Sequence, residues 1–114
     1  MKTKSEGFVL GKNIEWEKAD EGIVRQIMAY DGQIMMVRVL FKKGAVGAQH
    51  AHYHSQASYV VSGKFEVSLG QEKQVLVAGD SFYVEPDLIH GAVCLDEGEL
   101  IDVFSPHRAD FLKK

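Results

Sequence analysis

The stretch from Gly44 to Gly63, GAVGAQHAHYHSQASYVVSG, decides how the rest of the sequence is interpreted. Three of the five histidines of the chain fall within five positions of it, at His50, His52 and His54. Side chains at positions i and i+2 of a β-strand project from the same face, so His50 and His52 can present two imidazoles to one ion. This stretch therefore predicts half of a metal site.

The spacing around the histidine pair resembles the first motif of the cupin family. That motif has Gly, five residues, His-any-His, three or four residues, Glu, six residues and Gly. In this chain the corresponding positions are Gly44, His50, His52, Gln56 and Gly63. Gln56 thus stands where the family usually has a glutamate.

The segment from Gly79 to His90, GDSFYVEPDLIH, resembles the second cupin motif. Leu88 stands where the family has a glycine, and six residues rather than five separate Gly79 from Pro86. The two motifs together imply one divalent transition metal ion, such as Ni, Zn, Mn, Fe or Co. The implied ligands are His50, His52, Gln56 and His90.

Length and composition indicate a single small domain. A chain of 114 residues can bury most of its unfolded surface in one core. Its net charge of −3 argues against nucleic acid and anionic membranes as partners, since both favour a basic face. The single cysteine, Cys94, excludes an internal disulfide and is expected to be a small buried side chain. With no signal peptide or membrane span in view, we expect a reduced, cytoplasmic location.

The first half of the chain predicts strands before the histidine stretch. Residues 1–13 are polar and expected to be loose or to lie over a partner subunit, with the domain proper at 14–114. Ile14–Lys18 alternates like an edge strand, and Trp16 in it is expected to pack or to anchor a dimer. Ile23–Tyr30 and Ile34–Phe41 predict a hairpin, with the Asp-Gly pair at 31–32 forming a type I′ turn.

The second strand of that hairpin, IMMVRVLF, is apolar on both faces. A strand of this kind is covered on both sides, by the interior and by a second layer, so we expect a homodimer. Arg38 within it either pairs with a carboxylate or lines the pocket.

The second half of the chain predicts further short strands. Ser58–Ser62 and Lys64–Leu69 are expected to form a hairpin around Gly63, and Ile89–Cys94 and Glu99–Phe104 to be separate strands. About ten strands without helical periodicity predict an all-β antiparallel sandwich or barrel. The cupin resemblance narrows this to a single-domain double-stranded β-helix, a jelly-roll barrel. One helical turn starting near Ser105 is expected to close the chain.

An aspartate interrupts the apolar strand near the end of the chain. Alternation places Asp102 and Phe104 on one face, which is either the barrel interior beside the metal or a site where Asp102 is satisfied by an amide or an arginine. Arg108, beyond the strand, is by default a surface charge.

Beyond the two motifs, the sequence resembles the KdgF-type cupins through MAYDGQIMMVRV, HAHYHSQ, GDSFYVEP, HGAVCL and the tail IDVFSPHRADFL. These cupins convert 4,5-unsaturated monouronates, released from pectin or alginate by lyases, into the linear keto form. The resemblance implies this ring-opening enzyme activity, a small uronate substrate, and catalytic or substrate-binding roles for Asp102, Phe104 and Arg108. His54 is expected near the metal site or in the pocket wall, and His107 has no assigned role.

The ligand types favour one kind of metal chemistry. Three imidazoles and an amide are neutral, so the ion keeps its full charge and can polarise a substrate oxygen. A substrate-binding metal is favoured over a structural one, because structural sites prefer closed, cysteine-rich shells. The alternatives are a metal-dependent isomerase or oxygenase of the same fold, and a non-catalytic cupin that binds a sugar acid.

Overall fold

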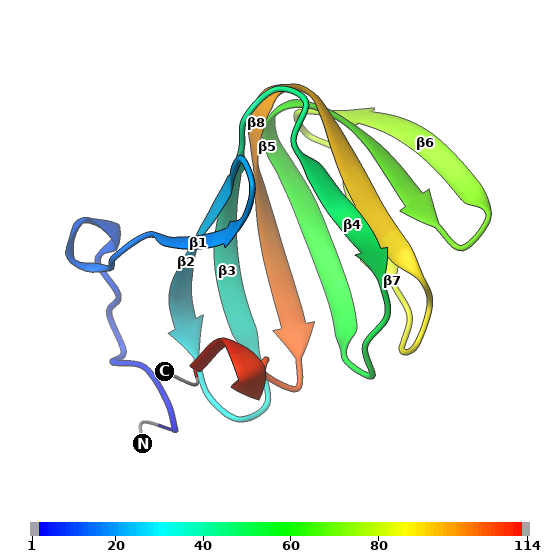
Figure 1. Ribbon diagram of the computed structural model, residues 1–114. Helices are drawn as coiled ribbons and strands as arrows, with labels where there is room; N and C mark the ends of the chain where they lie inside the picture. The colour runs from blue at the N-terminus through cyan, green and yellow to red at the C-terminus, as the bar shows by residue number, and fades with distance from the viewer. Residues whose placement is uncertain (1–2, 113–114) are drawn as a thin grey trace.

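The computed structural model describes residues 3–112 and shows strands that curve into a barrel (Figure 1). In chain order the elements are η1 (Gly11–Asn13), β1 (Glu17–Asp20), β2 (Ile23–Tyr30), β3 (Met35–Phe41), β4 (Val46–His50), β5 (Ser55–Leu69), β6 (Glu72–Val77), β7 (Ser81–Val84), β8 (His90–Ser105) and η2 (Ala109–Leu112). All strand pairs are antiparallel, in the order β1-β2-β3-β8-β5-β6, with β4 on β8 and β7 on β5. The predicted all-β fold is confirmed.

Two long strands, β5 and β8, run the length of the barrel side by side (Figure 1). The first part of β8 pairs with β4 and with the second half of β5. Its last part pairs with β3 and with the first half of β5. Each long strand therefore contributes to both sides of the barrel, and side chains from distant parts of the sequence meet in its interior.

The hairpin predicted around Gly63 does not form, and β8 replaces the two separate strands predicted at 89–94 and 99–104. Gly63, with φ +86°, and Gly98 lie against each other where β5 and β8 bend. A Cβ on Gly63 would lie 2.6 Å from the Glu97 carbonyl oxygen. Two glycines at this contact let the strands bend together without turning back, so the described residues form eight strands rather than about ten.

The β2–β3 hairpin is confirmed, but the predicted type I′ turn is wrong. Neither Asp31 nor Gly32 has the positive φ that such a turn requires. Instead, Asp31 Oδ1 accepts hydrogen bonds from the backbone N–H groups of Gln33 (2.8 Å) and Ile34 (3.2 Å). A side chain that closes the loop in this way removes the need for left-handed backbone.

The two faces of β3 differ in burial. Met35, Val37, Val39 and Phe41 point into the core, while Met36 on the outer face is 41% exposed. Arg38 is also on the outer face and pairs with Glu99 through Nε–Oε2 (2.6 Å) and Nη2–Oε1 (3.2 Å). The carboxylate-pairing alternative for Arg38 is therefore confirmed, whereas the predicted homodimer stays a prediction.

The ends of the described chain pack on the barrel. Ser5 exchanges hydrogen bonds with the backbone of Tyr30, and Gln26 Nε2 donates to the Gly11 carbonyl (2.6 Å). The division into a segment 1–13 and a domain 14–114 stays a prediction. The closing helical turn is η2, which begins at Ala109 rather than near Ser105, because β8 extends to Ser105. It lies across the lower ends of β2, β3 and β8 (Figure 1).

Candidate metal centre

Three histidines converge where β4 ends and β8 begins. His50 is the last residue of β4 and pairs with His90, the first residue of β8, while His52 lies in the loop between β4 and β5. One ring nitrogen from each of the three lies within 4.8 Å of the other two. The loop before β8 is joined to this cluster by the Asp87 N–H, which donates to the His52 carbonyl (2.7 Å). Asp87, at φ +68°, takes the left-handed conformation for which the cupin motif has a glycine one position later.

The backbone fixes which nitrogen of each ring faces the cluster. His50 Nδ1 lies 2.9 Å from the Ala48 carbonyl and His90 Nδ1 lies 2.9 Å from the Leu88 carbonyl. His52 Nδ1 has the same kind of contact, at 3.2 Å, with the His54 carbonyl. A carbonyl oxygen only accepts, so each Nδ1 carries the ring proton and each Nε2 presents a lone pair. This arrangement is typical of histidine ligands.

The protonation states agree with metal binding. Burial lowers the pKa of His52, and it lowers the pKa of His90 to about 4. Both rings are therefore neutral at pH 7. His90 Nε2 is buried and has no hydrogen-bond partner among the described residues. A buried lone pair without a donor is costly unless a cation takes it.

Gln56 provides a fourth donor atom. This β5 side chain is 6% exposed, and its Oε1 lies 3.0 Å from His52 Nε2. Because the His52 proton is on Nδ1, this contact joins two lone-pair atoms. Adjacent ligands of an octahedral ion with bonds of about 2.1 Å lie about 3.0 Å apart, so the spacing suits a shared cation. The four side chains thus fit a divalent ion with nitrogen and oxygen ligands.

Asp102 faces the same space from β8. It lines a pocket of about 360 Å³ together with His50, Gln56, His90, Phe104 and Arg108. Its Oδ1 accepts a short hydrogen bond from Ser58 Oγ (2.6 Å). Burial raises the pKa of Asp102 to about 6, against the opposing effects of the Ser58 hydrogen bond and the Arg108 charge. Asp102 therefore faces the barrel interior beside the candidate metal ligands, which was the first of the two alternatives. The hydrogen-bond partner of its carboxylate is Ser58 rather than Arg38.

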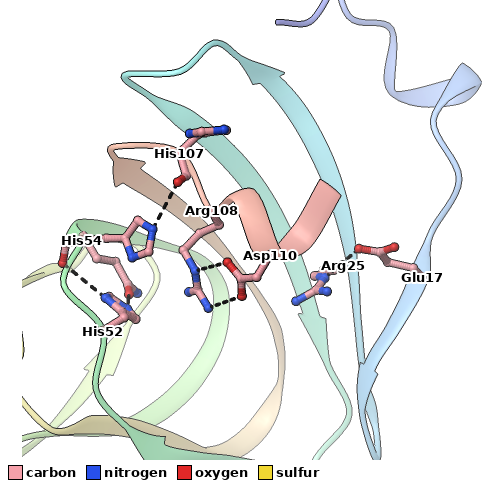
Figure 2. A network of polar contacts seen from close by, with 8 residues as sticks. Glu17, Arg25, His52, His54, His107, Arg108 and Asp110 are labelled. Atoms are coloured by element: carbon pink, nitrogen blue, oxygen red, sulfur yellow. Dashed lines mark hydrogen bonds and ion pairs between the residues drawn. The ribbon is translucent and has the colours of Figure 1, made fainter. Parts of the chain in front are cut away.

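Arg108 is not the surface charge expected by default, since its side chain is only 13% exposed. Its Nε and Nη2 donate to Asp110 Oδ1 (3.1 Å) and Oδ2 (2.9 Å), as Figure 2 shows. The guanidinium also lies over the rings of Phe104 (5.0 Å) and Phe111 (4.2 Å). Together these contacts fix a cation beside the pocket.

His54 and His107 lie beside the centre rather than in it. His54 is 4% exposed, and its Nε2 donates to the His107 carbonyl (3.1 Å), next to Arg108 in the chain (Figure 2). This hydrogen bond attaches the β4–β5 loop to the segment that carries Arg108. The His54 ring is not part of the converging group.

Three residues of this region were not singled out from the sequence: Arg25, Ser58 and Phe111. Arg25 lines the same pocket, with its guanidinium 3.7 Å from the Phe111 ring centre and its Nε donating to Glu17 (2.8 Å; Figure 2). The available signal was strand parity, since Arg25 shares a face with Ile23 and Ser58 shares a face with Gln56.

Comparisons with known proteins agree with this geometry. Residues 37–104 match the family model described as "Cupin domain". The chain belongs to the cupin family. It is 48% identical over 107 residues to the "Pectin degradation protein KdgF" of Dickeya dadantii, covering 92% of this chain and 97% of that protein.

Solved structures give the same result for this cupin. An RmlC-like cupin from Shewanella frigidimarina is 48% identical, with a TM-score of 0.94 over 96% of this chain and 99% of that one. KdgF from Halomonas sp. is 41% identical, with a TM-score of 0.89 over 94% and 99% of the two chains. The predicted jelly-roll architecture and the KdgF-like relationship are thereby confirmed. Within residues 3–112, no helix is long and apolar enough to cross a membrane.

Proposed function

We propose that this cupin is an enzyme that opens the ring of 4,5-unsaturated monouronates and converts them to linear keto-uronates. The observation that carries the proposal is the convergence of three imidazole lone pairs and an amide oxygen beside a pocket lined by an aspartate with a raised pKa and by an arginine held by Asp110. Its relatives include two proteins named KdgF, one of them described as a pectin degradation protein.

The substrate is held by its acid group. Arg108 uses Nε and one N–H of Nη2 for Asp110, which leaves Nη1 and the second N–H of Nη2 for a carboxylate. This second edge of the guanidinium is a planar fork that matches a carboxylate. The Phe104 ring, 3% exposed, forms the pocket wall beneath Arg108 and helps to exclude water.

A divalent ion held by His50, His52, Gln56 and His90 would supply Lewis-acid polarisation of a substrate oxygen. Opening the hemiacetal breaks the bond between C1 and the ring oxygen, which leaves an aldehyde at C1 and an enol at C5. Adding a proton at C4 while the enol loses its own then gives the C5 ketone, and the reaction is an isomerisation overall.

Asp102 is the group suited to move that proton. A general acid or base works best when its pKa lies near the working pH, and that of Asp102 is raised to about 6. Ser58 fixes the position of one carboxylate oxygen, and the other remains for the substrate. A cupin that only binds a sugar acid would need Arg108 but no such carboxyl group, so Asp102 favours the enzyme.

The test is to add the purified protein to lyase-generated unsaturated monouronates in deuterated water and to follow the ring form by NMR. The wild type should speed the loss of the ring form and place deuterium at C4. A His50→Ala/His90→Ala variant, matched in concentration, should return the rate close to the spontaneous one. Equal decay of the ring form with and without wild-type protein would remove the proposal.

The proposal extends to assembly and location. Met36, Val103, Ala57 and Tyr83 follow one another across the outer face of β3, β8, β5 and β7. Tyr83 is 58% exposed and Tyr59, on the same face, is 49% exposed. A second copy of the chain would cover these side chains, giving a homodimer.

The free, buried Cys94 suits a reduced cytoplasm.

A further inference from the structure

Ser58 is a polar residue in the interior of the barrel that contacts Gln56 as well as Asp102, and the chemistry above does not use the contact with Gln56. Its side chain is 2% exposed and points inward from β5, between Asp102 of β8 and Phe82 of β7 in the strand register. Val37 completes this row on the far side of Asp102. A serine in such a place must satisfy its hydroxyl with neighbouring groups.

The two hydrogen bonds of Ser58 have a fixed direction. Its Oγ lies 2.6 Å from Asp102 Oδ1 and 3.0 Å from Gln56 Nε2. An ionised carboxylate can only accept, so the single hydroxyl proton goes to Asp102. The hydroxyl can then only accept from Gln56, whose amide N–H₂ must face Ser58. The Gln56 amide oxygen is thereby turned toward the histidine cluster.

A glutamate at position 56 would not fit this chain of hydrogen bonds. Its carboxylate has no proton to donate, so it would compete with Asp102 for the one proton of Ser58. Gln56 departs from the usual cupin motif, which has a glutamate there. Unlike a glutamate, Gln56 can donate to Ser58 while Ser58 donates to Asp102.

We propose that Ser58 is a positioning residue that aims the Gln56 oxygen at the metal and holds Asp102 over the substrate. Residues 56 and 58 therefore act as a matched pair. The inference rests on the proposed function for the role of Asp102, whereas its effect on Gln56 depends on metal binding alone. Replacing a residue that orients a ligand typically weakens metal affinity or activity by about 10–100-fold.

The experiment measures Zn²⁺ affinity of chelator-stripped protein by competition with a chromogenic chelator, and kinetics on unsaturated monouronate at saturating Zn²⁺. Ser58→Ala should weaken Zn²⁺ binding by about 10–100-fold and lower kcat with little change in KM. Ser58→Thr, which keeps the hydroxyl, should restore both. Ser68→Ala is the matched control, because Ser68 is a buried serine of the same strand without a side-chain hydrogen bond among residues 3–112.

The decisive comparison repeats Ser58→Ala in a Gln56→Glu background. There Ser58 has no amide to orient, so its removal should leave Zn²⁺ affinity nearly unchanged. An equal loss in both backgrounds, or a loss no larger than that of Ser68→Ala, overturns the pairing. If the wild type fails to convert uronates, the proposed function falls, while the Zn²⁺ titrations still decide the role of Ser58 toward Gln56.

Discussion

Replacing Asp102 with asparagine should stabilise the metal-free protein and inactivate the loaded one. Burial raises the pKa of Asp102 from 3.8 to about 6, so the folded state disfavours the carboxylate. Each pH unit is worth about 1.4 kcal/mol, which makes the buried charge cost about 3 kcal/mol of folding free energy at pH 8. Asparagine keeps an oxygen that accepts from Ser58 but adds an amide N–H₂ to satisfy, so we expect a net gain of about 1–3 kcal/mol.

The stability gained by Asp102→Asn should depend on pH. A group with a raised folded pKa contributes stability below its unfolded pKa and loses that stability as pH rises through its folded pKa. Asp102→Asn should therefore gain most at pH 8 and little at pH 4. Kinetically, the loss of the proton carrier should lower kcat by about 10²–10⁴-fold with full metal content.

Urea unfolding followed by the fluorescence of Trp16, the single tryptophan, measures this effect. The protein is stripped of metal, because a bound cation beside Asp102 would itself stabilise the carboxylate, and its concentration is held fixed. Asp96→Asn, on an exposed part of β8, is the matched control for the loss of a charge. A stability gain that is equal at pH 4 and pH 8, or a loss at pH 8, would refute the reasoning. Near-wild-type turnover would remove Asp102 from the mechanism.

Three other predictions address the metal, the arginine and the assembly. The His50→Ala/His90→Ala variant should lose its divalent metal in elemental analysis, and a metal content equal to that of wild type would contradict the ligand assignment. Arg108→Ala should raise KM at least as much as it lowers kcat. Asp110→Asn should raise KM more weakly, because Arg108 keeps its contacts with Phe104 and Phe111. A change in kcat alone in Arg108→Ala would exclude carboxylate binding by Arg108. Light scattering at micromolar concentration should give the mass of a dimer for wild type and of a monomer for Met36→Lys, and a wild-type monomer would end the dimer proposal.

The placement of the site residues could be predicted where strand parity applied. Asp102 and Phe104 share a face because they lie two residues apart on one strand. The same rule predicted that His50 and His52 would meet, and their rings do converge, although His52 lies in the loop after β4 rather than on a strand. The prediction of His90 as a ligand depended on the family motif, because nothing in the local sequence relates His90 to His50. The register of β4 on β8 provides that relation in the folded chain.

The missed features depend on contacts between distant segments. Ser58 donates its hydrogen bond to Asp102, which is 44 positions away. Arg108 is largely buried because it packs over the ring of Phe104 and over Phe111 of η2, which itself contacts Phe104. The bend at Gly63 requires Gly98 on the neighbouring strand, so the sequence around Gly63 alone resembled a hairpin. Side-chain alternation reports the face of a residue but not its partner across the sheet.

The pocket also sets two opposing effects on the stability of the metal-free protein. Burial lowers the pKa of His90 from 6.5 to about 4 and lowers the pKa of His52. A lowered histidine pKa contributes stability above pH 6.5 that is lost as pH falls, because the unfolded chain takes up protons that the folded ring refuses. Asp102 acts in the opposite sense between pH 3.8 and about 6, so it offsets part of this loss. Removing it exposes the histidine contribution alone: Asp102→Asn should lose stability between pH 6.5 and pH 4 more steeply than wild type. Parallel curves over that range would mean that the folded-state pKa of Asp102 is not raised above its unfolded value.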